Sequence, residues 1–257
     1  MTKAIRVYNG LFGPDLTFAA LRMGDLIAVC NFLEWIRSQH THVNLKDVQM
    51  YIPDKVVFPS EHCLQFRDWL VNNTDYVTPY AQPNDLVELS IIAGTDQTYP
   101  SMYNLWNIRQ DVITQKQNVF HIPDAVKLPR LFEKRKKIVI QPLFDAPYNA
   151  NRNWSMSLFE DILVDHAFRG ALADYEIVVI TREHIINEMV GIKESYDFET
   201  NLRHVQEAEI FIGGDTGFSH FAASLVDGPK CEFWYPKTTY GTTNPFYWKT
   251  KHNMYYY

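Results

Sequence analysis

The sequence predicts an α/β protein made of two units, each built around a parallel β-sheet. Short apolar strand patterns alternate with helical patterns along both halves of the chain, which is typical of parallel βαβ units. Between the halves, the segment 123–137 contains two prolines and ends in four consecutive basic residues, and we interpret it as an interdomain linker. The length of 257 residues is sufficient for two small domains.

The first half is expected to contain three strands and three helices. The predicted strands are 4–8, 48–52 and 86–93, and two of the predicted helices are 61–71 and 103–113. The third helix is expected to begin at Gly24-Asp25 and to reach about Ser38. Its apolar residues recur at helical spacing and define one face: Leu26, Val29, Cys30, Leu33 and Ile36.

The second half shows the same alternation more clearly. The predicted strands are 138–141, 176–181, 210–212 and 231–234, and the predicted helices are 157–165, 199–207 and 219–226. Ser155 or Ser157 is the expected N-cap of the first of these helices. Two α/β units with a cleft between them would form a natural ligand site.

The charge, the cysteines and the lack of long apolar runs argue against several classes of protein. The net charge of −6 argues against broad nonspecific binding of nucleic acid, although the basic run Lys134–Lys137 leaves open either a solvated face or a local phosphate contact. The three cysteines, Cys30, Cys63 and Cys231, are far apart and are expected to be reduced thiols. No apolar run approaches the ~20 residues of a membrane helix, and the first ten residues lack the pattern of a signal peptide. We therefore expect a soluble, cytoplasmic protein.

The segment 211–223 carries the most specific motif. An apolar strand ends in Gly213-Gly214, an Asp-Thr-Gly turn follows, and a helix of small apolar residues begins. Glycines allow the backbone to approach a ligand closely, because they have no Cβ. Backbone N–H groups of Thr216 and Gly217, at the N-terminus of the helix, would suit a phosphate. On spacing alone, a plain tight turn is an equally good interpretation.

Three motifs in a fixed order resemble glycosyltransferase family 9, the ADP-heptose:lipopolysaccharide heptosyltransferases and their relatives. Gly24-Asp25 comes first, the segment 151–155 (Asn-Arg-Asn-Trp-Ser) follows, and the Gly214–Gly217 turn with Ser219-His220-Phe221-Ala222-Ala223 comes last. The resemblance covers roughly residues 136–235 and, before them, only the Gly-Asp helix. Ser155 stands where the family has proline, and the chain is shorter than typical members, so it resembles a short, divergent member.

The resemblance implies a GT-B fold, in which two Rossmann-like domains face a cleft. Residues 1–134 would form the acceptor-side domain and residues 135–257 the domain that binds the nucleotide sugar, with the tail packing back on the N-terminal domain. The implied activity is metal-independent, inverting transfer of a hexosyl or heptosyl group from a nucleotide-diphosphate sugar to an acceptor hydroxyl. No cofactor is implied, and the acceptor is left open among a glycan, a small molecule and a modified DNA base.

The resemblance also assigns roles to individual residues. Asp25 would be the catalytic base, and the Arg152 guanidinium would bind the diphosphate. The remaining donor-binding candidates are Asn151, Glu183, Gly214, Asp215, Thr216, Gly217 and His220. No residue is expected to bind a metal.

Several of these residues have a structural interpretation that stays open beside the functional one. Asp25 could be a simple N-cap, and Arg152 an exposed loop residue. Asp215 could fix its loop, because a carboxylate facing a phosphate would repel it. His220 could pack in the core, and Glu183 could lie in a surface loop. Trp154 suits a core position better than a stacking position.

Two other classes of protein remain compatible with the sequence. One is a non-catalytic protein that binds a nucleotide or nucleotide sugar. The other is a nucleotide-sugar epimerase, which would need a further acid and base. His121 and His184 are candidates for these groups but belong to no motif.

Overall fold

The computed structural model forms two compact units, Met1–Pro129 and Arg130–Tyr257, whereas the sequence analysis placed the boundary between residues 134 and 135. The structure describes residues 4–9, 22–24, 26–27, 30, 33–34, 37, 49–51, 60–78, 86–93, 127–144, 152–167, 174–182, 184–186, 191–236 and 253–257. The predicted helix at 103–113 lies outside these residues. Among the described helices, none is both long enough and apolar enough to cross a membrane.

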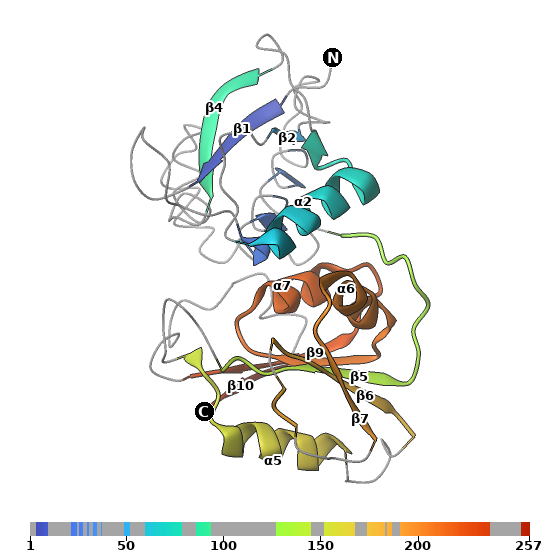
Figure 1. The fold of residues 1–257 in the computed structure, drawn as a ribbon. Coiled ribbons are helices and arrows are strands. Elements are labelled where there is room, and N and C mark those ends of the chain that lie inside the picture. The colour runs from blue at the N-terminus through green and yellow to red at the C-terminus, as the bar shows by residue number, and fades with distance from the viewer. Residues whose placement is uncertain are drawn as a thin grey trace. The chain divides into compact units, whose positions relative to one another are not determined.

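The first unit contains a four-stranded sheet in the order β3-β2-β1-β4, in which every neighbouring pair is parallel (Figure 1). Its strands are β1 (Ala4–Asn9), β2 (Gln49–Tyr51), β3 (Val77–Thr78) and β4 (Leu86–Ala93). Helix α2 (Glu61–Asn73) precedes β3 and buries Cys63, Phe66 and Leu70. The parallel register confirms the predicted βαβ character of this half.

The helix expected after Gly24-Asp25 is seen at its described residues. Leu26, Cys30 and Leu33 are helical and fully buried, as their spacing predicts. Further along, the guanidinium of Arg37 lies 3.1 Å from the carboxylate of Asp75 and joins this helix to the residues after α2.

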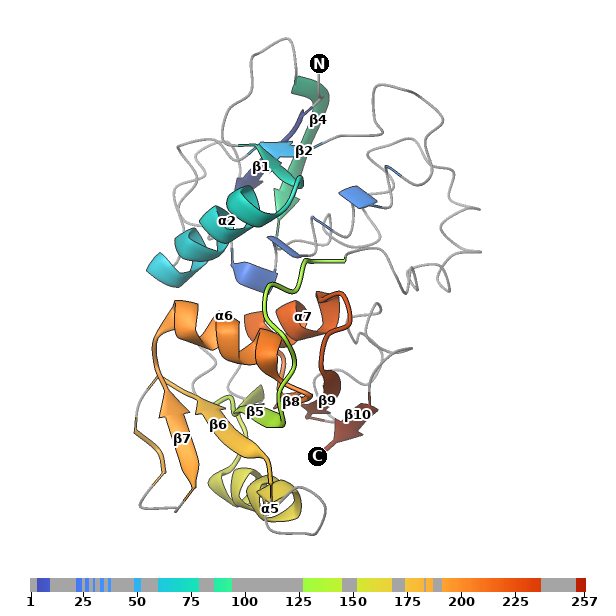
Figure 2. The same ribbon diagram turned by 90° about the vertical axis from the view of Figure 1, so that its right-hand side faces the viewer.

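The second unit contains a six-stranded, fully parallel sheet in the order β10-β9-β8-β5-β6-β7. Helices α6 and α7 cover one face of this sheet and α5 covers the other (Figures 1 and 2). Its strands are β5 (Lys137–Gln141), β6 (Glu176–Ile180), β7 (Ile192–Ser195), β8 (Ile210–Gly213), β9 (Lys230–Tyr235) and β10 (Asn253–Tyr256). Its helices are α5 (Met156–Ala167), α6 (Phe198–Glu207) and α7 (Gly217–Ser224).

The core of the second unit lies on both faces of the central strands. Successive strand residues point to opposite faces, and residues 137–140 of β5 are all buried, as expected for a parallel sheet covered by helices. On the α5 side, Ile138 and Ile140 pack in one cluster with Trp154 and Phe159. The predicted α/β class, with one parallel sheet in each half, is therefore confirmed.

The three cysteines are all free and buried, as Cys30 was expected to be from its place in an apolar helical face. Burial raises the pKa of the Cys30 and Cys231 thiols, so both are protonated at neutral pH.

Candidate functional site

The candidate site lies where β5 and β8 end side by side. The two strands are parallel, and Gln141 at the end of β5 pairs in register with Gly213 at the end of β8. The turn Gly214-Asp215-Thr216 follows Gly213 directly and leads into α7. Crevices at the carboxyl ends of parallel strands are the usual ligand sites of open α/β sheets.

Thr216 organises the turn through its side chain. Its hydroxyl oxygen accepts a hydrogen bond from the Ser219 amide at 3.2 Å and so caps α7. The same hydroxyl donates to the side-chain oxygen of Gln141 on the neighbouring strand. The Ser219 hydroxyl donates to the carbonyl of Gly214 at 2.5 Å. Gln141, predicted only as the last residue of a strand, therefore helps to hold this turn in place.

The amide groups at the start of α7 differ in whether they have a hydrogen-bond partner within the protein. The Thr216 amide donates to the carbonyl of Gly214 at 3.1 Å, so the turn itself engages the N–H group that was expected to face a phosphate. The amides of Gly217 and Phe218 have no partner among the residues that the structure describes. Of the two amides predicted to suit a phosphate, the Thr216 amide is thus bonded within the turn, and a phosphate contact of the Gly217 amide stays a prediction.

Packing inside the protein leaves little room for a Cβ at either glycine. A Cβ on Gly213 would lie 2.8 Å from the Ser219 hydroxyl oxygen and 2.9 Å from a ring carbon of Phe211. A Cβ on Gly214 would lie 3.1 Å from the indole nitrogen of Trp154. In the Cβ directions, the space next to these glycines, where a close approach of a ligand was predicted, is therefore filled by Ser219, Phe211 and Trp154.

Asp215 connects the two candidate basic residues of the site. One carboxylate oxygen lies 3.2 Å from the Arg152 guanidinium, and the other lies 3.4 Å from Nε2 of His220. The side chains of Asp215 and His220 are nearly buried, whereas about a third of the Arg152 side chain is exposed. Asp215 thus ties its loop to Arg152 and to α7, which agrees with the interpretation that Asp215 fixes this loop.

The loop that carries Arg152 is tied to the sheet. The amide of Trp154 donates to the carbonyl of Leu143, just beyond β5, at 2.7 Å. Trp154 is 3% exposed and sits in the core, which confirms its interpretation as a core residue. Ser155 accepts a hydrogen bond from the amide of Leu158 at 3.1 Å, so it is the N-cap of α5.

A second loop follows β6 at the same edge of the sheet. The amide of Thr181 donates to the carbonyl of Ser195 at the end of β7.

Glu194 accepts hydrogen bonds from the amides of Ile185 and Ile186 at 2.8 and 2.9 Å. Burial raises the pKa of Glu194, but hydrogen bonds from Tyr196, the loop amides and His184 outweigh burial and lower the pKa to about 2. A charged Glu194, which no motif indicated, therefore anchors this loop.

His184 lies in the same loop. Its Nδ1 atom is 2.5 Å from Glu194, and its side chain is largely exposed. Its observed contact is thus with the carboxylate that anchors the loop.

The predicted site residues separate into two groups. The structure brings Arg152, Asp215 and His220 together, next to the turn formed by Gly214, Thr216 and Gly217. The other candidates lie outside the described residues: Asp25, Asn151 and Glu183. Their roles stay predictions.

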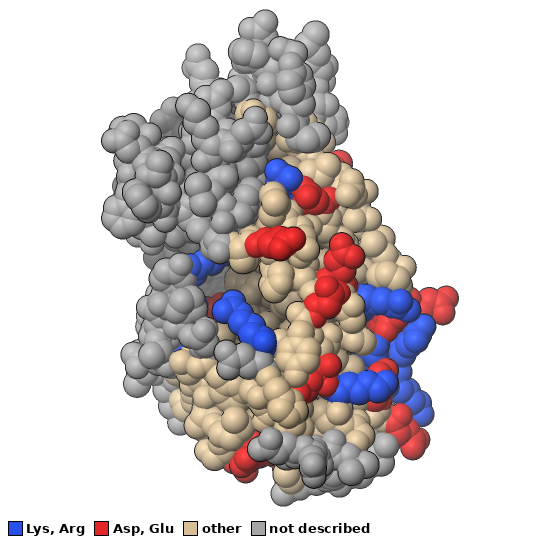
Figure 3. Space-filling model, in the orientation of Figure 1, with Lys and Arg blue, Asp and Glu red and all other residues tan. Residues whose placement is uncertain are grey.

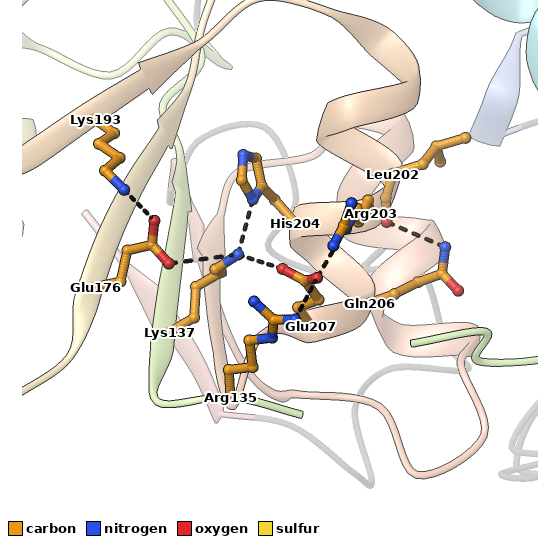
Figure 4. Close-up of polar contacts among 9 residues, drawn as sticks. All are labelled: Arg135, Lys137, Glu176, Lys193, Leu202, Arg203, His204, Gln206 and Glu207. Carbon is orange, nitrogen blue, oxygen red and sulfur yellow. Dashed lines mark hydrogen bonds and ion pairs between the residues drawn. The ribbon is translucent and has the colours of Figure 1, made fainter. Parts of the chain in front are cut away.

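The basic run Lys134–Lys137 lies at the opposite edge of the sheet from this turn, because Lys137 begins β5 and Gln141 ends it. Lys137 is buried against Glu207, and Lys136 lies 3.7 Å from Asp174 (Figure 4 shows the Lys137 contacts). On the face drawn in Figure 3, Lys and Arg side chains are interspersed with Asp and Glu side chains. Lys136 and Lys137 of the run therefore take part in ion pairs within the second unit.

Comparisons with known proteins return solved structures only. No family model matches the chain, and no curated protein matches it. The chain is similar to the iron-containing dodecameric glycosyltransferase TibC from enterotoxigenic E. coli H10407, with a TM-score of 0.48 and 12% identity over 91% of this chain. It is also similar to the glycosyl transferase family 9 protein from Veillonella parvula DSM 2008, with a TM-score of 0.44 and 11% identity over 99% of this chain.

The two neighbours differ in how much of their length is matched. The chain covers 58% of TibC and 85% of the Veillonella protein. Both are glycosyltransferases, and the second carries the name of the family that the sequence motifs resemble.

Proposed function

We propose that this chain is a glycosyltransferase that moves a sugar from a nucleotide-diphosphate sugar to an acceptor hydroxyl, with inversion and without a metal ion. The observation that carries the proposal is the meeting of Arg152 with the Asp215 turn, 3.2 Å apart, at the N-terminus of α7. A cation and the amides at a helix N-terminus, at the carboxyl edge of a parallel sheet, suit the binding of a diphosphate.

Arg152 can serve both the protein and the ligand. A guanidinium carries five N–H groups in a planar fork, so it can donate to the Asp215 carboxylate and to phosphate oxygens at the same time. The amides of Gly217 and Phe218 would add donors from the neutral backbone. In this arrangement Asp215 orients the cation, and the cation keeps the carboxylate from repelling the phosphate.

The proposed reaction is a single displacement at the anomeric carbon. The acceptor oxygen attacks that carbon on the face opposite the diphosphate, the bond to the diphosphate oxygen breaks, and its electron pair leaves with the nucleoside diphosphate. The acceptor proton passes to a carboxylate, which the family resemblance assigns to Asp25. Arg152 and the α7 amides would stabilise the negative charge that grows on the leaving group.

The donor site is tested by thermal-shift measurements with ADP, UDP, GDP and CDP and with the corresponding nucleotide sugars. A ligand that binds only the native state raises the unfolding temperature by mass action. We expect one nucleotide to stabilise the wild type and Arg152→Ala to remove the shift. Arg135→Ala is the matched control, because Arg135 is exposed and precedes β5 at the other edge of the sheet. No shift with any of these ligands would overturn the proposal.

A second measurement distinguishes transfer of the sugar from binding of the nucleotide sugar alone. Release of nucleoside diphosphate from the identified nucleotide sugar is followed with candidate glycan and small-molecule acceptors, for the wild type and for Asp25→Asn. We expect acceptor-dependent release that persists in EDTA and is lost in Asp25→Asn although the donor still binds. Binding without release, for every acceptor, would favour the non-catalytic alternative.

A further inference from the structure

Tyr257 lies against the candidate site from the far end of the sequence. It follows β10, and its amide donates to the carbonyl of Tyr235 at the end of β9 at 3.0 Å. Its ring packs against the α5-side core that contains Trp154. The backbone and ring of Tyr257 are thus fixed by the sheet and by the core.

The hydroxyl of Tyr257 reaches the backbone of the Arg152 loop, residues 152–155. It donates a hydrogen bond to the carbonyl of Arg152 at 3.0 Å and approaches the carbonyl of Asn153 at 3.4 Å. Burial raises the pKa of Tyr257 to about 12, so the phenol is protonated at neutral pH and acts as a donor.

The Arg152 loop is therefore held from two sides. The Leu143 carbonyl accepts from the amide of Trp154 at 2.7 Å, and the Tyr257 hydroxyl holds the carbonyls before it. The Arg152 side chain extends from this fixed backbone to Asp215. A shift of the loop by a fraction of an ångström would move the guanidinium relative to a bound ligand. The strength of a charged hydrogen bond depends on the distance and angle between donor and acceptor, so such a shift would weaken binding.

On the basis of the proposed function, we infer that Tyr257 is a positioning residue, whose hydroxyl holds the Arg152 loop where the guanidinium can meet the donor diphosphate. Tyr257 acts through Arg152 and has no role in the chemistry itself. Its contribution to ligand binding should therefore vanish when the Arg152 side chain is removed.

The test compares Tyr257→Phe with Tyr255→Phe. Phenylalanine keeps the ring and removes only the hydroxyl, so Tyr257→Phe is expected to fold. Tyr255 lies in β10, just before Tyr257, with about a third of its surface exposed and its ring stacked on Trp234, and its hydroxyl makes no hydrogen bond to any described residue. Hydrogen exchange of a peptide that contains residues 152–155 reports on the loop without any ligand. Calorimetric titration with the nucleoside diphosphate found by thermal shift reports on binding.

We expect faster exchange of the 152–155 peptide in Tyr257→Phe and wild-type exchange in Tyr255→Phe. Nucleotide binding should weaken about threefold to tenfold in Tyr257→Phe, the range for one net hydrogen bond. In an Arg152→Ala background, titrated with millimolar ligand, Tyr257→Phe should cause no further loss.

Three outcomes would overturn the inference, and they are distinguishable. Unchanged exchange in Tyr257→Phe would show that the hydroxyl does not hold the loop, whatever the protein binds. An equal loss of affinity with and without Arg152 would show a general structural effect. Faster exchange in a protein whose wild type binds no nucleoside diphosphate would overturn the proposed function, and with it the diphosphate role of the loop.

Discussion

Asp215 and Arg152 form an ion pair of 3.2 Å between two segments that are distant in the sequence. The Asp215 side chain is 12% exposed, so its charge is largely removed from water and depends on its partners. The same carboxylate also lies near His220, on the first turns of α7. The pair therefore joins the loop before α5 to the turn before α7 and defines the candidate site.

Asp215→Asn is expected to lower the free energy of unfolding by about 1 to 3 kcal/mol, because it removes a nearly buried charge that two basic groups face. Urea denaturation monitored by circular dichroism measures the change. The control is Asp174→Asn, whose side chain is 81% exposed and lies 3.7 Å from Lys136. An exposed pair of this kind contributes about 0.5 kcal/mol or less. Equal effects of the two substitutions would contradict the prediction.

Gly213→Ala is expected to destabilise the protein by about 1 to 3 kcal/mol, because the added methyl group meets Ser219 and Phe211 at less than a normal contact distance. Gly214→Ala should cost less, since its nearest neighbour, the indole nitrogen of Trp154, is 3.1 Å away. The unfolding midpoints of both variants, measured without ligand, test this order. If the glycines serve only the approach of a ligand, both variants will be as stable as the wild type.

Most of the second unit could be predicted because its central strands are continuous apolar runs. Strands β5, β6, β8 and β9 were expected at nearly their observed positions. The interiors of β5, β6 and β8 are apolar, as expected for strands buried on both faces, whereas β9 also contains the buried Glu232. Strand β7 was missed because Lys193 and Glu194 interrupt its apolar pattern at the edge of the sheet. Strand β10 was missed because an aromatic tail has no strand period, and its pairing with β9 depends on tertiary contacts.

The candidate site could be predicted where its signal is local. The Asp-Thr-Gly turn is a short motif, and it leads directly into α7, as the sequence predicts. The partners of that turn could not be predicted, because Gln141 and Arg152 reach it only through the order of strands in the sheet and the course of the loops. The motif indicated that glycines matter at positions 213 and 214, and a close approach of a ligand was the predicted cause. The structure shows instead that a Cβ there would press against Ser219 or Trp154.

Lys137→Met is expected to cost roughly 3 kcal/mol of unfolding free energy, because it leaves the buried Glu207 carboxylate without its closest cation. Nζ of Lys137 lies 2.5 Å from Glu207, and both side chains are 3% exposed (Figure 4). Arg203 still pairs with Glu207 at 2.8 Å, which places the loss at the lower end of the range for a broken buried pair. Chemical denaturation measures the loss.

Two variants control for general effects of losing this lysine. Lys136→Met removes an exposed charge from the neighbouring position and should change stability by about 0.5 kcal/mol or less. The double variant Lys137→Met/Glu207→Leu removes both charges and should recover most of the loss, because no buried charge is then left unpaired. A double variant as unstable as Lys137→Met alone would show that packing, and not charge, explains the effect.

The same cluster predicts a loss of stability in weak acid. Burial and the charge of Lys137, whose Nζ lies 2.9 Å from Nδ1, lower the pKa of His204 below its usual 6.5. Burial raises the pKa of Glu207, but hydrogen bonds from Lys137 and Arg203 outweigh it and hold the pKa below 4.5. Glu176, on the other side of Lys137, also has a lowered pKa, through its hydrogen bond from Lys193. All three groups therefore bind protons more readily in the unfolded chain.

Because the unfolded state takes up more protons, the stability that these three groups contribute is fully present above pH 6.5 and falls as the pH drops. The loss comes first from His204 and then, below pH 4.5, from the two carboxylates. His204→Asn should therefore flatten the dependence of unfolding free energy on pH between neutral pH and about pH 5. NMR titration of the His204 ring should give a midpoint below 6.5 that rises in Lys137→Met and stays unchanged in Lys136→Met. Parallel stability curves for the wild type and His204→Asn would show that Lys137 does not oppose protonation of this ring.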